Sequence, residues 1–245
     1  MKIQIKNTIL NYEVSGVGPP LIFLHGWGCD LKTFDKIAAQ INEDFTVYQL
    51  DLPGFGQSEI NEAYSLEEYA NILNKFCTKM KISNPIIIAH SFGGRIAIMY
   101  ASKYRVKKLV LVASPGIKER FNLIKWTKIR IYKVLKKFNI KNNLGSKDYK
   151  NANELLKAVL VKAVNYDLSE ELSKIKCETL LLYGKKDKVV PPYIGKKINE
   201  KIKNSGIVLL DTAHFPYIEK FRTFLIIVKS FLYGENLWLV FSLVF

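Results

Sequence analysis

The sequence is poor in the residues on which metal, redox and disulfide chemistry depends. It contains three cysteines, Cys29, Cys77 and Cys177, an odd number without the spacing of a metal site or a redox pair. Isolated thiols are typical of a reducing compartment, so we expect a cytoplasmic protein without a metal ion or other cofactor. No glycine-rich loop precedes a Lys-Ser or Lys-Thr pair, which argues against a nucleotide-binding P-loop.

Long hydrophobic segments are also missing. The N-terminal residues 1–6 alternate between polar and apolar and contain no hydrophobic signal core, so export is not expected. The apolar run at residues 237–245 is far shorter than the roughly 20 residues of a membrane-spanning helix. We therefore expect no integral membrane segment.

Arginine is scarce although the chain is basic. The net charge is +15, and five of the 37 Lys and Arg residues are arginines. Nucleic-acid sites favour the planar Arg fork, so no nucleic-acid partner is expected. Residues 118–150 hold eleven basic and two acidic residues, a local net charge of +9. We interpret them as helices with a solvated lysine face, with a surface for an anionic partner as the alternative.

The most informative segment is an apolar strand over residues 85–90 that runs directly into Ser91. Gly93 and Gly94 follow and lead into a helix-forming run. A strand that turns sharply into a helix with serine at the corner is a nucleophile elbow, usually written G-x-S-x-G. The residues two before and two after the serine must be small, a requirement that Ala89 nearly meets and Gly93 meets. The pattern predicts that Ser91 is a catalytic nucleophile.

A serine nucleophile needs a base that accepts its proton. The chain has three histidines. His90 is adjacent to Ser91, where neighbouring side chains point apart, so it is expected to pack rather than react. His25 ends an early predicted strand. His214 follows the last predicted strand, at the sheet edge where open α/β sheets place their sites, and is the expected base.

The base needs an acid that orients it, and the transition state needs an oxyanion hole. For the acid we favour Asp187, in the loop after the next-to-last strand, over Asp211, which we expect to shape a turn. For the oxyanion hole we expect the backbone N–H of Phe92, directly after the nucleophile, and that of Trp27 in the early glycine-rich turn.

Strands that alternate with helices predict a mostly parallel sheet with helices on both faces, preceded by an antiparallel hairpin around residues 7–8. Further strands are expected at 21–25, 45–51, 85–90, 108–113, 179–183 and 207–210, and helices at 31–41, 66–80, 95–101, 192–202 and 217–232. Ser65 and Glu68 form a predicted capping box. Residues 115–170 have helical periodicity, which predicts a cap inserted between core segments 1–114 and 171–233, followed by an apolar tail at 234–245.

Five motifs together resemble the α/β-hydrolase superfamily, in particular small bacterial carboxylesterase-like members with a helical cap. They are His25-Gly26-Trp27-Gly28, the Asp51–Ser58 loop, Ala89–Gly94, Gly184-x-x-Asp187 and His214-Phe215-Pro216. The resemblance spans about residues 1–232 and includes the family's order of nucleophile, acid and base. It departs at Ala89 and Ala213, where the family usually has glycine. The serine disfavours dehalogenase and epoxide hydrolase chemistry, in which aspartate occupies the elbow.

The resemblance implies an α/β-hydrolase fold and a serine hydrolase that cleaves a small to medium carboxylic ester or thioester through an acyl-enzyme. Two alternatives remain: a hydrolase of carbon–carbon bonds, and a catalytically silent protein that binds a small ligand in the same pocket. The partner is expected to be a small-molecule ester, and we expect Phe121 and Trp126 of the cap to line its acyl pocket.

Overall fold

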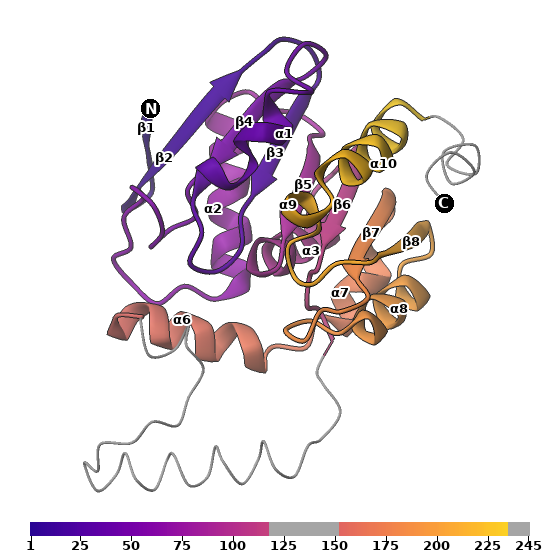
Figure 1. Ribbon diagram of the computed structural model, residues 1–245. Coiled ribbons are helices and arrows are strands. Elements are labelled where there is room, and N and C mark those ends of the chain that lie inside the picture. The colour runs from indigo at the N-terminus through magenta and orange to yellow at the C-terminus, as the bar shows by residue number, and fades with distance from the viewer. Residues whose placement is uncertain (118–151, 235–245) are drawn as a thin grey trace, which may run out of the picture.

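The computed structural model describes residues 1–117 and 152–234, which contain an eight-stranded sheet of order β1-β2-β4-β3-β5-β6-β7-β8 (Figure 1). The strands are β1 (Lys2–Ile5), β2 (Thr8–Ser15), β3 (Pro20–Leu24), β4 (Thr46–Leu50), β5 (Ile86–His90), β6 (Lys108–Val112), β7 (Glu178–Gly184) and β8 (Ser205–Leu210). The pairs β1–β2 and β2–β4 are antiparallel, and the other pairs are parallel. The predicted mostly parallel sheet with an N-terminal hairpin is confirmed.

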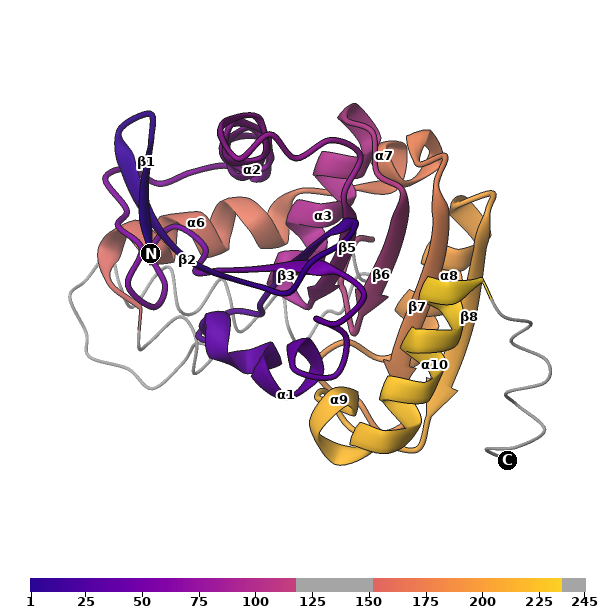
Figure 2. The same ribbon diagram turned by 90° about the horizontal axis from the view of Figure 1, so that it is seen from above.

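Helices cover both faces of this sheet, as predicted. They are η1 (Leu31–Phe34), α1 (Asp35–Ala38), α2 (Leu66–Lys79), α3 (Phe92–Lys103), α6 (Glu154–Asn165), α7 (Ser169–Lys174), α8 (Pro192–Lys201), α9 (Pro216–Glu219) and α10 (Phe221–Tyr233). One hydrophobic core joins α2, α3, α7 and α8 to the sheet, and a second joins α1, α9 and α10 to the opposite face. Figure 2 shows α2 and α3 on one side of the strands and α1, α9 and α10 on the other.

Two predicted helices differ in form. The segment predicted as a helix over 31–41 is a 3₁₀ turn followed by a single α-helical turn. The predicted closing helix over 217–232 is interrupted at Lys220, which has φ −131° and ψ 52°. The physical reason lies in Glu219, whose carboxylate accepts hydrogen bonds from the backbone of the preceding loop at Ala213 and Phe215. These bonds keep α9 with the loop, while α10 packs on the sheet.

The carboxyl ends of the parallel strands form the edge at which the predicted catalytic residues lie. From central β3 the chain passes to β4 on one side and later to β5 on the other. Such a switch in strand order leaves a crevice at the carboxyl ends, where open α/β sheets bind their ligands. Ser91 follows β5 beside β3, at this switch.

The predicted cap insertion begins and ends at neighbouring points of the core. The backbone N–H of Leu168 donates to the carbonyl of Gly116 over 2.9 Å. Residues 118–151, with the predicted substrate-binding residues Phe121 and Trp126, lie outside the described residues, as does the tail from 235 onward. The division into core, cap and tail therefore stays a prediction. Among the described residues, no helix has the length and apolar character needed to cross a membrane.

The start of α3 packs against two strand ends with no room for additional atoms. A Cβ at Gly93 would lie 2.5 Å from the carbonyl oxygen of Leu24 and 2.6 Å from that of His25. A Cβ at Gly94 would lie 1.9 Å from Ser114 Oγ, in the segment after β6. Real Cβ contacts this short do not occur, so glycine at both positions allows the nucleophile helix to reach the sheet.

This packing predicts that Gly94→Ala is destabilising and that Ser114→Gly compensates for it. Overpacking should lower the free energy of unfolding by about 1–3 kcal/mol. Removing the Ser114 side chain leaves its Cα, at 3.4 Å, as the nearest of the three contacts. Urea unfolding of both single variants and the double variant should give a favourable coupling of about 1 kcal/mol or more. Additive effects would show that Ser114 is not the obstacle.

Candidate active site

Ser91 occupies a strained corner between β5 and α3. Its backbone has φ 49° and ψ −111°, in a region that side-chain-bearing residues rarely adopt. Its N–H donates to the carbonyl of Val112 on β6 over 2.9 Å, which fixes the corner to the neighbouring strand. Strain of this kind persists where the surrounding structure imposes it, and it is typical of functional sites.

The side chains of Ser91, His214 and Asp187, which were predicted to act as one catalytic unit, lie within hydrogen-bond distance of one another in series. The Ser91 hydroxyl lies 3.2 Å from His214 Nε2, and His214 Nδ1 lies 2.7 Å from Asp187 Oδ2. With the proton on Nδ1, His214 donates to Asp187 and accepts from Ser91. Asp187 Oδ1 also accepts from the backbone of Val189 and Val190, at 2.7 and 2.9 Å. The carboxylate is fully buried yet well supplied with donors.

The competing carboxylate, Asp211, faces solvent. It forms an exposed ion pair with Lys186 at 2.8 Å, and the hydrogen bond from this ammonium lowers the pKa of Asp211. Its interaction is therefore with a surface lysine, whereas the hydrogen bond to His214 comes from Asp187. This geometry favours Asp187 as the orienting acid.

The loops that carry Asp187 and His214 lie directly against each other. A Cβ at Gly184 would be 2.0 Å from the carbonyl oxygen of Ala213, and the Lys186 N–H donates to the carbonyl of Thr212 over 2.9 Å. Glu219 binds the second loop from α9. Glu219 was not among the residues predicted for the site; its position five residues after His214 was the available signal.

The candidate oxyanion donors lie on either side of the nucleophile. A Cβ at Gly26 would be 3.4 Å from Ser91 Cβ, so the turn leading to Trp27 passes beside the serine. Phe92 is the first residue of α3, where backbone N–H groups have no acceptor within the helix. The Phe92 N–H can therefore serve an anion near Ser91, and the oxyanion role of Phe92 and Trp27 stays a prediction.

An aromatic wall, formed by Trp27, Phe55, Phe92 and Tyr69, continues from these two residues. The ring centroids of Trp27 lie 5.0 Å from Phe55 and 5.2 Å from Phe92, and those of Tyr69 and Phe92 are 5.4 Å apart. All three pairs pack edge to face, a favourable arrangement. Phe55 was not among the residues predicted for the site, although it lies in the Asp51–Ser58 loop after β4.

Buried His25 connects the loops after β3 and β4. Its Nδ1–H donates to the carbonyl of Gly26 over 2.7 Å, and its Nε2 accepts from the N–H of Leu52 over 3.0 Å. Burial lowers the pKa of His25, so the ring is neutral and Nε2 is free to accept. His25 thus supports the turn beside Ser91 rather than serving as the base.

His90 packs behind His214, as expected, and also binds it. Its Nε2–H donates to the backbone carbonyl of His214 over 3.0 Å, and its Nδ1 accepts from the Tyr217 hydroxyl over 3.3 Å. The rings of His90 and His214 are 4.8 Å apart. Burial lowers the pKa of His90 to about 3, so it adds no positive charge beside the base.

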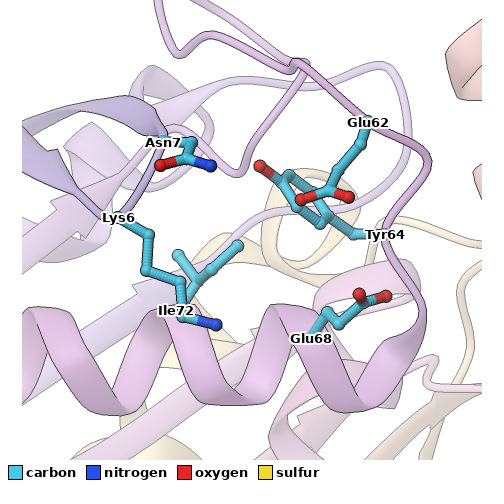
Figure 3. A pocket seen from close by; sticks show the side chains of 6 residues that line it. All are labelled: Lys6, Asn7, Glu62, Tyr64, Glu68 and Ile72. Carbon is cyan, nitrogen blue, oxygen red and sulfur yellow. The ribbon is translucent and has the colours of Figure 1, made fainter.

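A polar pocket elsewhere lacks this chemistry. Figure 3 shows it between the β1–β2 turn, the loop before α2 and α2 itself. It is lined by Lys6, Asn7, Glu62, Tyr64, Glu68 and Ile72. The Glu68 carboxylate already completes the predicted capping box with Ser65, so it serves the helix start. In the part of the chain that is described, no cluster of His, Cys, Asp or Glu is arranged to hold a metal ion.

The chain is similar in sequence to a described protein family and to a known esterase. A family model described as alpha/beta hydrolase fold matches residues 19–140. A pimeloyl-(acyl-carrier protein) methyl ester esterase of Wigglesworthia glossinidia brevipalpis is 30% identical over 88% of this chain and 94% of that protein.

Among solved structures, an esterase from Exiguobacterium antarcticum has a TM-score of 0.78 and 22% identity, covering 94% of this chain and 98% of its own. The enol-lactonase from Burkholderia xenovorans LB400 has a TM-score of 0.77 and 21% identity. The match covers 95% of this chain and 99% of the lactonase chain. These two structures establish the fold.

The two carboxylates are distinguished by matched substitutions. Asp187→Asn should lower kcat by about three to four orders of magnitude, because the amide no longer holds His214 in the required tautomer. Asp211→Asn should change kcat by less than about threefold, since it removes an exposed ion pair. Steady-state kinetics on an activated ester measures both. A larger loss in Asp211→Asn would assign the orienting role to that residue.

His90 is predicted to position the base through its hydrogen bond. His90→Phe keeps a ring but removes the donor to the His214 carbonyl, and should lower kcat by about tenfold or more by displacing the base. His90→Gln places an amide N–H near Nε2 and should restore most of this loss. Equal kcat values for the two variants would show that His90 contributes only by packing and not through its hydrogen bond to the His214 carbonyl. Tyr217→Phe is the control that retains the donor.

Proposed function

The chain belongs to the α/β-hydrolase family, and we propose that it is a serine hydrolase that cleaves carboxylic esters through an acyl-enzyme at Ser91. The observation that carries the proposal is the continuous hydrogen-bond chain from Ser91 Oγ through His214 to buried Asp187. A silent binding protein has no need for this chain. The naming of sequence relatives as methyl ester esterases also favours ester hydrolysis over carbon–carbon cleavage.

In the first half-reaction, Ser91 Oγ attacks the ester carbonyl carbon while its proton passes to His214 Nε2. Asp187 stabilises the resulting imidazolium and holds its orientation. The carbonyl oxygen becomes an oxyanion that accepts hydrogen bonds from the Trp27 and Phe92 N–H groups. When the tetrahedral intermediate collapses, the bond to the alcohol oxygen breaks, and His214 returns the proton to this leaving group.

The second half-reaction repeats these steps with water. His214 Nε2 removes a proton from a water molecule, whose oxygen attacks the acyl carbon. The tetrahedral intermediate then expels Ser91 Oγ, which regains a proton from His214, and the carboxylic acid leaves. The buried, neutral rings of His25 and His90 support this cycle, because neither adds charge next to the imidazolium.

We further propose that the enzyme prefers ester substrates whose acyl group is of small to medium length. Trp27, the partly exposed member of the aromatic wall, lies beside the nucleophile and packs on the buried rings of Phe55 and Phe92. It offers an apolar surface, and apolar pockets bind acyl chains through buried methylene groups. Activity on p-nitrophenyl esters should rise from acetate to butyrate or hexanoate and then fall. The basic composition of residues 118–150 favours neutral or weakly anionic acyl groups over cationic ones.

The proposal is tested by labelling with a fluorophosphonate and by kinetics of Ser91→Ala and His214→Ala. Wild type should be labelled and should hydrolyse p-nitrophenyl butyrate. Each variant should lose about three or more orders of magnitude in kcat while its circular dichroism spectrum stays unchanged. An unlabelled wild type would indicate a silent binding protein, and comparable turnover by Ser91→Ala would remove the serine mechanism.

A further inference from the structure

A buried arginine joins the nucleophile helix to α6. Within α3, Arg95 is the only charged residue among the buried ones, and it is 7% exposed. Its Nη1 donates to the carbonyl oxygen of Ala163 over 2.9 Å and to that of Tyr166 over 3.2 Å. These acceptors belong to the last turn and the C-cap of α6. They carry the negative end of the helix dipole, which favours a cation.

A buried carboxylate completes this cluster. Glu171 of α7 is 8% exposed, and its Oε1 accepts from the Tyr166 hydroxyl over 2.9 Å. This hydrogen bond raises the pKa of Tyr166 to about 12, so the phenol stays a donor. Tyr166 thus connects the guanidinium, through its carbonyl, with the carboxylate, through its hydroxyl. Buried charges are costly unless they are paired or solvated by polar groups; here the Tyr166 hydroxyl binds Glu171 Oε1, while the buried Oε2 has no hydrogen-bond partner among the described residues.

The other end of α6 rests on the loop that carries the aromatic wall. A Cβ at Gly54 would lie 2.8 Å from Leu156 Cδ2, so this leucine side chain lies directly on the Gly54 backbone. The next residue, Phe55, contacts Trp27 beside the nucleophile. In the last turn of α6, Lys162 donates to the carbonyl of Ala63, just before α2. Figure 1 shows α6 extending below α2 and α3.

We propose that Arg95 is a positioning residue that sets acyl-chain selectivity: it holds α6 against the nucleophile helix and, through Leu156 and Gly54, keeps the aromatic wall close to Ser91. The inference rests on the proposed ester hydrolysis at Ser91. It does not assign Arg95 to the chemical step, because the guanidinium hydrogen bonds that carry the inference go to carbonyls of α6.

The position of α6 therefore limits the space for the acyl chain. When the guanidinium is removed, the C-terminal carbonyls of α6 lose their cation, and the helix can move away from the Gly54–Phe55 loop. The pocket should then accept longer chains, while Ser91, His214 and Asp187 keep their hydrogen bonds. A structural role without effect on the pocket would lower stability and leave the selectivity unchanged.

The experiment compares Arg95→Met, Arg95→Lys and the control Arg105→Met, which changes an exposed arginine just after the same helix. For each, kcat and KM are measured on p-nitrophenyl acetate, butyrate, hexanoate and octanoate. Arg95→Met should raise the octanoate-to-butyrate ratio of kcat/KM by about fivefold or more, mainly through KM. Arg95→Lys keeps the charge and should be intermediate, and Arg105→Met should match wild type.

Fluorophosphonate labelling separates this proposal from the proposed function. In folded Arg95→Met, the labelling rate should stay within about twofold of wild type, because the triad is unchanged. An unchanged or lower ratio, or a uniform loss on all esters with a parallel loss of labelling, would overturn the role of Arg95. If Arg95→Met does not fold by circular dichroism, the same ratio in Arg95→Lys decides. An unlabelled wild type would instead refute the proposed function.

Discussion

The close approach of the nucleophile helix to the sheet is the constraint on which the rest of the site depends. At Gly93 and Gly94 the α3 backbone lies against the ends of β3 and β6 with no space for a Cβ. This contact places Ser91 at a strained corner and puts the Phe92 N–H at a helix N-terminus, where it is available to an anion. The same contact brings the Gly26 turn to the side of Ser91. One packing requirement therefore positions both the nucleophile and the candidate oxyanion donors.

The charges around the nucleophile are distributed unequally, in a way that suits acyl transfer. Asp187 is buried next to His214, where it can stabilise a developing imidazolium. The two other histidines are buried and neutral, and both use their ring nitrogens to bind backbone groups of the surrounding loops. A positive charge on either ring would oppose protonation of His214. Burial therefore supplies two hydrogen-bonding rings without competing charge.

The cluster of Arg95, Tyr166 and Glu171 extends this organisation beyond the reacting groups. It joins α3, which begins at the nucleophile, to α6, which contacts the loop of the aromatic wall. Polar contacts of this kind are specific in geometry, whereas apolar packing alone allows a helix to shift. The Ser91–His214–Asp187 hydrogen bonds lie at the carboxyl ends of the strands, and the Arg95 hydrogen bonds attach α6 to the helix that follows Ser91.

The sequence by itself determined the sheet and most element boundaries, and it predicted Ser91, Asp187 and His214 as nucleophile, acid and base. Continuous apolar strands, the Ser65 capping box and the elbow glycines are local signals, and each was found where predicted. The break at Lys220 was missed, because Glu219 ends α9 through bonds to a loop that only folding brings near. For the acid, the sequence favoured Asp187 over Asp211, although both follow strands at the same edge.

Only the tertiary structure decided which carboxylate reaches His214, that His90 binds the His214 backbone, and that Arg95 binds α6. The two residues of each contact are far apart in the sequence: 27 positions for Asp187 and His214, and 124 for His90 and His214. Arg95 lies 68 and 71 positions from its two partners at the end of α6. Local pattern carries no information about such pairs, because the packing of distant elements creates them.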